Sequence, residues 1–465
     1  INQNLTSTAI DADILLKAKE NITQGNSVDI TTNGGDITLW SNSVDAGGYI
    51  YLNDNVTLDS RSSTDRAAGN ISSASGGGAI TLGGGSSGTT IPSGYALQSS
   101  TSGAVAGITL GTIDTSFPDV TAIDFQVHDS QVSIFSGGGN IGMNGKATNS
   151  SQNTIYGIYG LDGLEIDSGD AGNITLVGEA SGKTDARGMF IGTRSNSGVS
   201  THLRSGSGNI IVEGTASGAS SFNHGISING HGDSWGTIES TNGGSITLTG
   251  SGEGTSPLDF RIYIYNILAN SGTITINGKK SLADGLIQFS NFGSGTLSGT
   301  GSDGLTNNAG VIDVNVGASS SNIIFNEDHL TFSGWGGRVR TNGNFTLSPY
   351  NTSFSSALNW SDNLIALNST GGGNITGLTI GKPGNTANID LSSALTVVGP
   401  ISVYGGDIAI NQNLTSTAID ADILLKATEN ITQASSVDIT TNGGDVVYWS
   451  DSDASGSISS AGGTI

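Results

Sequence analysis

The sequence contains no cysteine and has few prolines, few basic residues and no long apolar run. Without cysteine, neither disulfides nor thiolate metal sites can hold the fold together. Sixteen Lys and Arg against 39 Asp and Glu give a net charge of −23, the wrong sign for binding nucleic acid or anionic lipid headgroups. No segment approaches the roughly 20 apolar residues that a transmembrane helix needs. The composition therefore argues against a nucleic-acid-binding protein and against a chain that spans a membrane.

Turn-forming residues are abundant instead. Gly accounts for 73 of 465 residues, and Ser, Thr and Asn fill much of the remainder. The apolar residues are mainly Ile, Leu, Val and Ala, which suit short strands joined by many turns. The sequence therefore predicts an all-β protein with almost no helix.

One long segment occurs twice. Residues 1–41 return nearly unchanged at residues 410–450, an offset of 409. We therefore interpret residues 1–409 as one complete long repeat that forms a continuous β-solenoid, and residues 410–465 as the start of its next copy. The partners predicted by this pattern are other copies of the same repeat in the same chain, with lateral association of fibres as a further option.

A shorter motif recurs inside the long repeat. A Gly-containing turn and a polar residue precede an apolar-x-apolar triplet, as in GGDITLW at residues 34–40 and AGNITLVG at residues 171–178. Period-two alternation is typical of a half-buried strand. Such short strands bury their apolar faces only when they stack, as in a solenoid. The residues predicted to share one elongated core are Ile37, Leu39, Ile80, Leu82, Ile174, Leu176, Ile246, Leu248, Ile274 and Ile276.

The alternative architecture is a string of antiparallel β-sandwich domains. It predicts proline-marked linkers and about one buried Trp per domain of roughly 100 residues, whereas the motif here recurs over tens of residues. The pattern thus favours the solenoid, and residues 11–22 are predicted to form a strand rather than a helix.

The rungs with Asn and Gly corners, such as GGDITLWSNS and GNITLVGEASG, resemble filamentous haemagglutinin-type exoproteins and related giant bacterial surface proteins. This resemblance implies a right-handed parallel β-helix with a fibrous or adhesive role. It also implies a bacterial protein at the cell surface or outside the cell. The first residues lack a basic segment followed by an apolar one, so we expect any export signal to lie outside this sequence.

A carbohydrate-binding or polysaccharide-cleaving β-helix is the alternative function. The run from Gly230 to Ser234, which contains His231, together with Arg261-Ile262, faintly resembles polygalacturonase signatures. Cleavage of glycosidic bonds needs convergent carboxylates, and the carboxylate motifs of that family do not precede His231. We therefore expect no enzymatic activity.

No cofactor is predicted. The acidic pairs Asp11/Asp13 and Asp420/Asp422 are the candidates for a weak Ca²⁺ site, although solvated carboxylates explain them as well. None of the five histidines has metal-ligand spacing with another: His128, His202, His224, His231 and His329.

One region departs from the repeat by concentrating aromatic residues and arginine, which are enriched at contact hot spots and sugar-stacking surfaces. It is the candidate contact surface for a glycan or cell-surface ligand, while a rung core filled by larger side chains is the other interpretation. Its residues are Phe260, Arg261, Tyr263, Tyr265, Phe332, Trp335, Arg338 and Arg340.

Taken together, these patterns predict a structural or adhesive segment of a secreted or cell-surface fibre built of tandem long repeats. With rungs of roughly 20 residues spaced by about 4.8 Å, one unit should advance the fibre by on the order of 100 Å. Ile14 and Ile423 should then occupy equivalent core positions along one axis.

Overall fold

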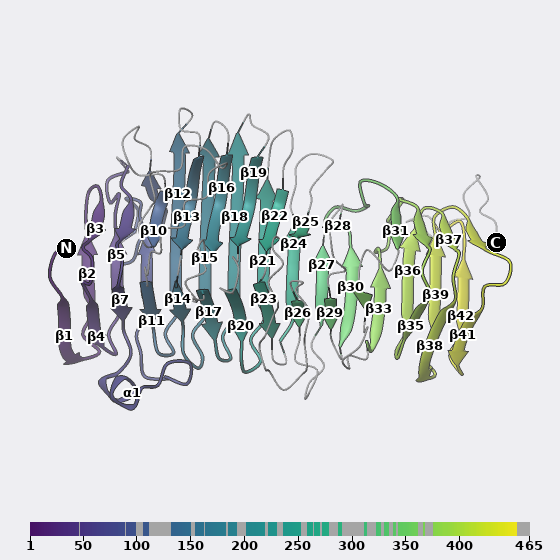
Figure 1. Ribbon diagram of the computed structural model, residues 1–465, viewed down its shortest axis with the longest axis horizontal. Coiled ribbons are helices and arrows are strands. Elements are labelled where there is room, and N and C mark those ends of the chain that lie inside the picture. Colours follow the sequence, from purple (N-terminus) through teal and green to yellow (C-terminus); the bar gives the residue numbers. More distant parts are fainter. Residues whose placement is uncertain are drawn as a thin grey trace.

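The structure is a computed structural model of the chain. It describes residues 1–45, 47–88, 90–98, 106–110, 132–149, 154–161, 163–182, 185–192, 201–218, 222–229, 236–252, 258–263, 265–269, 272–278, 287–290, 311–313, 322–326, 330–333, 338–340, 343–360, 366–367 and 375–452. These residues are all β apart from one short helix, α1 (Ser63–Ala68), as predicted from the composition. Figure 1 shows the strands side by side along the longest axis, with the two termini at opposite ends.

The strands form three long parallel sheets and two short ones. The longest, sheet 1, has the order β2 (Ile14–Lys17), β5 (Ile37–Trp40), β8 (Ile80–Gly83), β12 (Ile141–Asn149), β15 (Ile174–Gly182), β18 (Ile210–Gly218), β21 (Ile246–Gly252), β24 (Ile274–Gly278), β27 (Ile323–Asn326), β30 (Asn344–Ser348), β33 (Gly377–Ile380), β36 (Ile401–Gly405), β39 (Ile423–Ala427) and β42 (Val446–Trp449), with β9 (Ala96–Gln98) beside β12.

Sheet 2 has the order β1 (Leu5–Ile10), β4 (Ile30–Asn33), β7 (Val56–Asp59), β11 (Val132–Phe135), β14 (Glu165–Asp167), β17 (Thr201–Ser205), β20 (Gly236–Ser240), β23 (Tyr265–Ala269), β26 (Val311–Asp313), β29 (Arg338–Arg340) and β32 (Ala366–Leu367). Sheet 3 has the order β3 (Ile22–Gln24), β6 (Ile50–Leu52), β10 (Ala106–Leu110), β13 (Thr154–Leu161), β16 (Asp185–Gly192), β19 (Phe222–Asn229), β22 (Leu258–Tyr263), β25 (Ile287–Ser290) and β28 (Leu330–Ser333).

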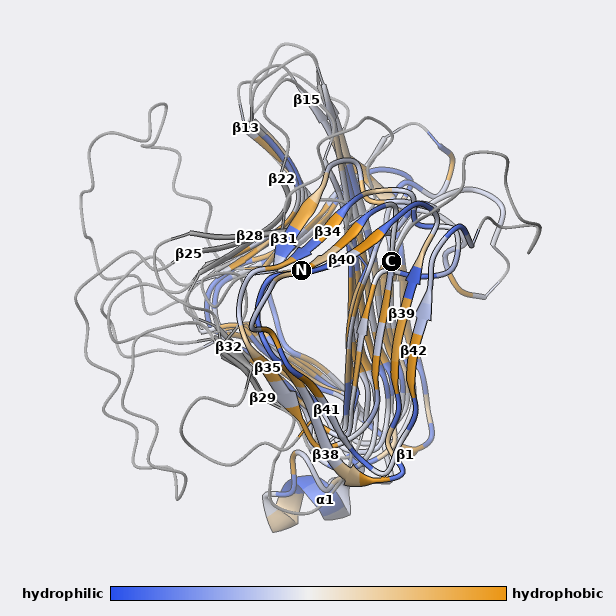
Figure 2. Ribbon diagram, turned by 90° about the vertical axis from the view of Figure 1, so that its right-hand side faces the viewer, coloured by the Kyte–Doolittle hydropathy of each residue, from blue (hydrophilic) through white to orange (hydrophobic). Residues whose placement is uncertain are grey.

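The two short sheets lie toward the C-terminus. Sheet 4 contains β31 (Leu358–Trp360), β34 (Ile389–Leu391), β37 (Ile408–Ile410) and β40 (Ile431–Gln433). Sheet 5 contains β35 (Leu395–Val397), β38 (Leu414–Ile419) and β41 (Ile439–Asn442). The chain visits the sheets in turn, so that β36 pairs with β39 and β37 pairs with β40, each in parallel. Figure 2 shows the strands grouped into three sides when the molecule is seen end-on.

Parallel pairing argues against one of the two predicted architectures. Sandwich domains pair neighbouring strands in antiparallel fashion, whereas the ladders of the described strands are parallel and join strands from successive passes of the chain. The sandwich alternative is therefore wrong for the described residues. The arrangement is consistent with a β-helix, and β2 confirms the strand predicted within residues 11–22.

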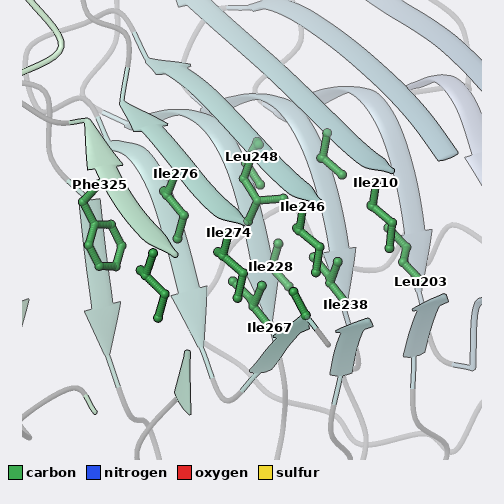
Figure 3. Packing of buried hydrophobic residues seen from close by; sticks show 14 of the residues in the cluster. Leu203, Ile210, Ile228, Ile238, Ile246, Leu248, Ile267, Ile274, Ile276 and Phe325 are labelled. Atoms are coloured by element: carbon green, nitrogen blue, oxygen red, sulfur yellow. The ribbon is translucent and has the colours of Figure 1, made fainter. Parts of the chain in front are cut away.

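The predicted core is confirmed. All ten Ile and Leu residues named from the motif are fully buried and belong to one hydrophobic cluster that extends along the stack. Ile210, Ile246 and Ile274 are register partners on β18, β21 and β24, and Figure 3 shows them in one row. Burial of each such side chain contributes roughly 1.5–3 kcal/mol of transfer free energy. The repetition of the motif thus produces a continuous core.

The Gly and polar residues of the motif form ladders at the corner that precedes sheet 1. A Cβ added to Gly208 would lie 2.0 Å from the carbonyl oxygen of Gly172, and one added to Gly244 would lie 1.9 Å from that of Gly208. The next residue along the chain is polar because its side chain bonds to the following rung, as when Asn173 Oδ1 accepts the Asn209 backbone N–H at 2.8 Å. Backbones therefore approach closely at this corner, and only Gly fits.

The predicted advance of one unit is wrong. Register partners on sheet 1 are 23 residues apart between Ile14 and Ile37 but 61 apart between Ile80 and Ile141, because the connections differ in length. Sheet 1 has thirteen strands from β2 to β39, and hence twelve steps. At about 4.8 Å per step the unit advances by about 58 Å rather than about 100 Å. Ile14 and Ile423 do occupy equivalent first positions of strands in the same sheet, and the strand order never reverses between them.

Candidate functional site

The predicted aromatic and arginine contact surface is spread over two sheets. By backbone position, β22 and β28 lie in sheet 3 with β25 between them, and β23 and β29 lie in sheet 2 with β26 between them. Trp335 and the side chains of the other seven residues lie outside the described part of the structure. The contact surface therefore stays a prediction.

The histidines are similarly separated. His231, His128 and His329 lie outside the described residues, whereas His202 lies on β17 in sheet 2 and His224 on β19 in sheet 3. Burial, aided by the positive charge of Arg204, lowers the pKa of His202 below its ordinary value of 6.5. Within the described residues, no group of three or more His, Asp and Glu side chains is placed to hold a metal ion. Of the predicted Ca²⁺ candidates, Asp13 and Asp422 each accept the backbone N–H of the next rung.

A charged cluster that the sequence analysis missed lies beside α1 on sheet 2. Asp59 is buried and makes ion pairs with Arg61 at 2.8 Å and with Arg66 at 3.2 Å. Arg61 also donates to the Asn70 carbonyl oxygen at 2.6 Å, and Arg66 donates to that of Thr32 at 2.8 Å. The cluster holds the segment around α1 against the sheet, so its paired carboxylate is poorly suited to acid–base chemistry.

A second buried carboxylate continues this cluster along the stack. Asp167 accepts from the Ser72 hydroxyl at 2.7 Å and lies 3.6 Å from Arg204, which is also 3.4 Å from Glu239. Neighbouring Glu165 has its pKa raised above the ordinary value of 4.5 by burial. The sequence does carry a signal for this cluster: Asp59 and Arg61 stand just before Ser62, a residue type that favours helix starts. In the structure Ser62 caps α1 by accepting the Asp65 backbone N–H.

An outward groove of about 650 Å³ lies over sheet 4. Its polar side chains form a corner ladder: Asn388 Oδ1 accepts the Asp407 backbone N–H at 2.9 Å, and Asp407 Oδ1 accepts that of Asn430 at 3.1 Å. These side chains already bond to successive rungs. The groove therefore has a structural explanation.

The start of the second copy folds in the same way as the start of the first. β38 to β42 begin at the positions that follow β1 to β5 by 409 residues. Leu5 pairs with Ile30 as Leu414 pairs with Ile439, and both ladders shift register at the same place. Near-identical sequence thus gives near-identical pairing at opposite ends of the molecule.

Side-chain contacts are repeated as well. Asn4 Oδ1 accepts the Asp29 backbone N–H at 2.9 Å, and Asn413 Oδ1 accepts that of Asp438 at 2.8 Å. The Lys17 ammonium lies 3.4 Å from the Trp40 ring centroid in the first copy. Its counterpart in the second copy, Lys426, lies 3.8 Å from that of Trp449. The start of the second copy therefore repeats the structure of the first as well as its sequence.

The two copies differ in which of their side chains are buried. Some residues are buried only in the first copy, and others are fully buried only in the second. Trp40 is fully buried under β8, whereas Trp449 is 45% exposed and Val446, which replaces Ile37, is 41% exposed. Conversely, Ile423 is fully buried against β36, whereas Ile14 is only partly buried. Among the described residues, no strand pairs with the outer side of β2 or of β42.

Each end of the molecule thus presents a surface that the other copy has covered. The edge at β1, β2 and β3 matches the edge by which β38, β39 and β40 pair with the preceding rung. Such an edge offers backbone N–H and C=O groups in register together with apolar side chains, a combination that accepts further strands. These two edges are the strongest candidate for a functional surface on the described part of the chain.

No helix among the described residues is long and apolar enough to cross a membrane. Comparison with known proteins gives no matching family, no matching curated protein and no matching solved structure.

Proposed function

We propose that this chain is a structural segment of a fibre in which successive 409-residue units continue one parallel β-helix. The observation that carries the proposal is the structural equivalence of the two copies, with each copy burying the edge that the other exposes. Because β38 to β42 reproduce β1 to β5, a unit placed after the second copy would meet the same edge that β4 and β5 offer to β7 and β8. The unit is thus built to be followed by itself.

We propose that the β-helix is right-handed. Crossovers between parallel strands of one sheet are right-handed in nearly all known cases because of the twist of the strands. Right-handedness also agrees with the resemblance to filamentous haemagglutinin-type exoproteins that the corner motifs suggest.

An extracellular or cell-surface position and an adhesive role complete the proposal. They are supported by the acidic, cysteine-free composition and by a fold held by repetition rather than by disulfides. Antibodies against the chain should label intact source cells from outside; labelling only after permeabilisation would reject this location.

The fibre itself is tested by adding one unit. A chain in which residues 44–452 are repeated once after residue 452 should appear in electron micrographs as a rod about 58 Å longer than the original, at unchanged width. Its far-ultraviolet circular dichroism per residue should match that of the original chain. Two rods joined at variable angles, or a rod that thickens instead of lengthening, would reject the continuous fibre.

A further inference from the structure

One face of sheet 1, away from both ends of the stack, carries no charge. It lies on the six neighbouring strands from β21 to β36, whose inward side chains are buried and whose outward ones are half-buried. None of the outward side chains on these strands is charged, although the chain has a net charge of −23. We name this face the uncharged strip; Figure 2 shows sheet 1 as a straight side of the molecule, with β39 labelled on it. The first outward column of register partners is Thr247, Thr275, Ile324, Thr346, Thr379 and Ser402.

The side chains of the second outward column bond to one another. Asn277 Nδ2 donates to Thr249 Oγ1 at 3.2 Å. Asn326 Nδ2 donates to Asn277 Oδ1 at 2.9 Å, and the Ser348 hydroxyl donates to Asn326 Oδ1 at 2.5 Å. Burying a polar group is costly mainly when the group loses its partner, so a column paired in this way can be covered at little cost. The pairing also leaves few groups to bind sugar hydroxyls, which favours a protein surface over a glycan as the occupant.

Charges of opposite sign stand just beyond the two ends of the strip. Glu213 lies on β18, next to β21, and Lys426 lies on β39, next to β36. Both belong to the second outward column, because Glu213 pairs in register with Thr249 and Lys426 with Tyr404. A strip that meets a reversed copy of itself therefore brings each Glu213 opposite a Lys426. A copy running in the same direction would instead place the two Glu213 side chains at the same level.

We propose that the uncharged strip binds the same strip of a second copy of this chain, with the two stacks antiparallel. The contact is isologous, and its two-fold axis runs parallel to the strands between β27 and β30. Facing sheets pack about 10 Å apart, which suits the short side chains of the strip. On the acidic remainder of the surface, two copies repel each other. The proposal concerns contacts between neighbouring stacks, so it goes beyond the continuation of units along one axis.

The size of the strip limits the strength of this contact. Six strands spaced by about 4.8 Å, with about five residues of roughly 3.3 Å each, present roughly 500 Å². Two copies then bury about 1,000 Å² in total, which is near the lower limit for a specific interface. A pair of single chains should therefore associate weakly. A fibre of successive units would present one strip per unit and would gain from multivalency.

The first test places a charge at the centre of the strip. In sedimentation velocity we expect the original chain to form dimers at concentrations of roughly 0.1–1 mM. Thr346→Glu should weaken this association by about tenfold or more, because the dimer would bury two unpaired carboxylates close to its axis. The matched control is Thr396→Glu, which adds the same charge at an exposed outward position of β35 in sheet 5 and should leave the dimer unchanged. Unchanged circular dichroism verifies that both variants fold.

A charge swap tests the antiparallel direction. Glu213→Lys brings lysines face to face at both ends of the strip, and Lys426→Glu brings glutamates face to face, so each should weaken the dimer. The double variant Glu213→Lys/Lys426→Glu should restore it, because unlike charges face each other again. The two positions are seven steps apart on sheet 1, or about 34 Å, so an ion pair within one chain cannot explain the restoration.

Four results would overturn the proposal. They are the absence of dimers of the original chain up to about 1 mM, an equal loss of association in Thr346→Glu and Thr396→Glu, and a charge swap that fails to restore the dimer. The fourth is binding of a monomeric original chain to an insoluble polysaccharide such as cellulose, if Thr346→Glu abolishes it, because the strip would then belong to a glycan. All four are measured on chains with a single strip, so they leave the separate test of the continuous fibre untouched.

Discussion

At the residue scale, each position of the recurring motif has a distinct physical role. The apolar pair packs into the core, the polar residue bonds to the next rung, and the glycine allows the backbones to touch. Buried hydroxyls complete the corner, since Ser205 donates to the carbonyl oxygens of Gly172 and Gly208 at 2.9 Å each. A motif that is weak as a sequence signal is therefore strongly constrained at every position once the rungs stack.

The first prediction concerns the corner glycines. Gly208→Ala should lower the free energy of unfolding by about 1–3 kcal/mol, because its Cβ would overlap the Gly172 carbonyl oxygen and force the backbone to shift. Gly142→Ala is the control, as its Cβ would meet nothing within 4 Å. Urea unfolding measures both, and equal losses of stability would contradict the close-approach explanation.

The second prediction is a dependence of stability on pH. The pKa of His202 is lowered in the folded chain, so protonation favours the unfolded chain. The stability that neutral His202 allows is fully present above pH 6.5 and is lost progressively as the pH falls below that value. The midpoint of thermal unfolding should therefore decline less between pH 7.5 and 5.5 in His202→Gln than in the original chain.

Glu165 provides the control for this dependence. Its pKa is raised, so its protonation favours the folded chain and opposes the effect of His202 as the pH falls. Glu165→Gln should accordingly keep the decline below pH 6.5 or steepen it. A decline that persists unchanged in His202→Gln would show that other groups cause it.

The third prediction concerns catalysis. We expect no release of reducing ends from polygalacturonate or related acidic glycans, because the buried carboxylates described above are paired with arginine and hold α1 and its neighbours in place. Activity in the original chain that disappears in His231→Ala would contradict a purely structural role.

At the scale of single elements, the sequence predicts the strands of sheet 1 well and the connections poorly. Alternation of apolar residues, as at Ile37 and Leu39, is a local property that each short strand carries in itself. The length of a connection is not a local property of any strand. The sequence therefore did not predict the 61-residue interval between the register partners Ile80 and Ile141. The sequence did not predict α1, because a helix of six residues shows no helical periodicity. Its two ends are nevertheless capped, by Ser62 at the start and by Gly69 in the left-handed conformation at the end.

The candidate site was harder to predict than the fold. The concentration of aromatic residues predicted a contact surface on the strands from β22 to β29. The strongest candidate surfaces in the structure are instead the edges at the two ends. Edge exposure depends on which strand comes next and not on the strand's own residues: Trp40 and Trp449 have the same local sequence role but opposite burial. No local pattern encodes that difference.

The fourth prediction uses those two tryptophans. Trp449 is 45% exposed and Trp40 is fully buried. In acrylamide quenching of tryptophan fluorescence, Trp449→Phe should therefore lower the readily quenched emission, whereas Trp40→Phe should leave it in place. Equal quenching of the two variants would contradict the difference between the two ends.

At the scale of the whole molecule, stacking makes stability a sum of contacts between neighbouring rungs. Among the described residues, the near-identical copies place the same strands at both ends of the stack with opposite edges exposed. This arrangement is the one that the proposed fibre of successive units requires.

The fifth prediction tests that arrangement through the distance between equivalent positions of the two copies. Leu15 and Leu424 follow Ile14 and Ile423 on outward-facing positions of β2 and β39, twelve steps apart on sheet 1. With spin labels on Leu15→Cys and Leu424→Cys, pulsed dipolar spectroscopy should give a narrow distribution centred at about 58 Å. A distance below about half of this value, or a broad distribution, would show that the chain doubles back or bends between the copies and would contradict one continuous stack.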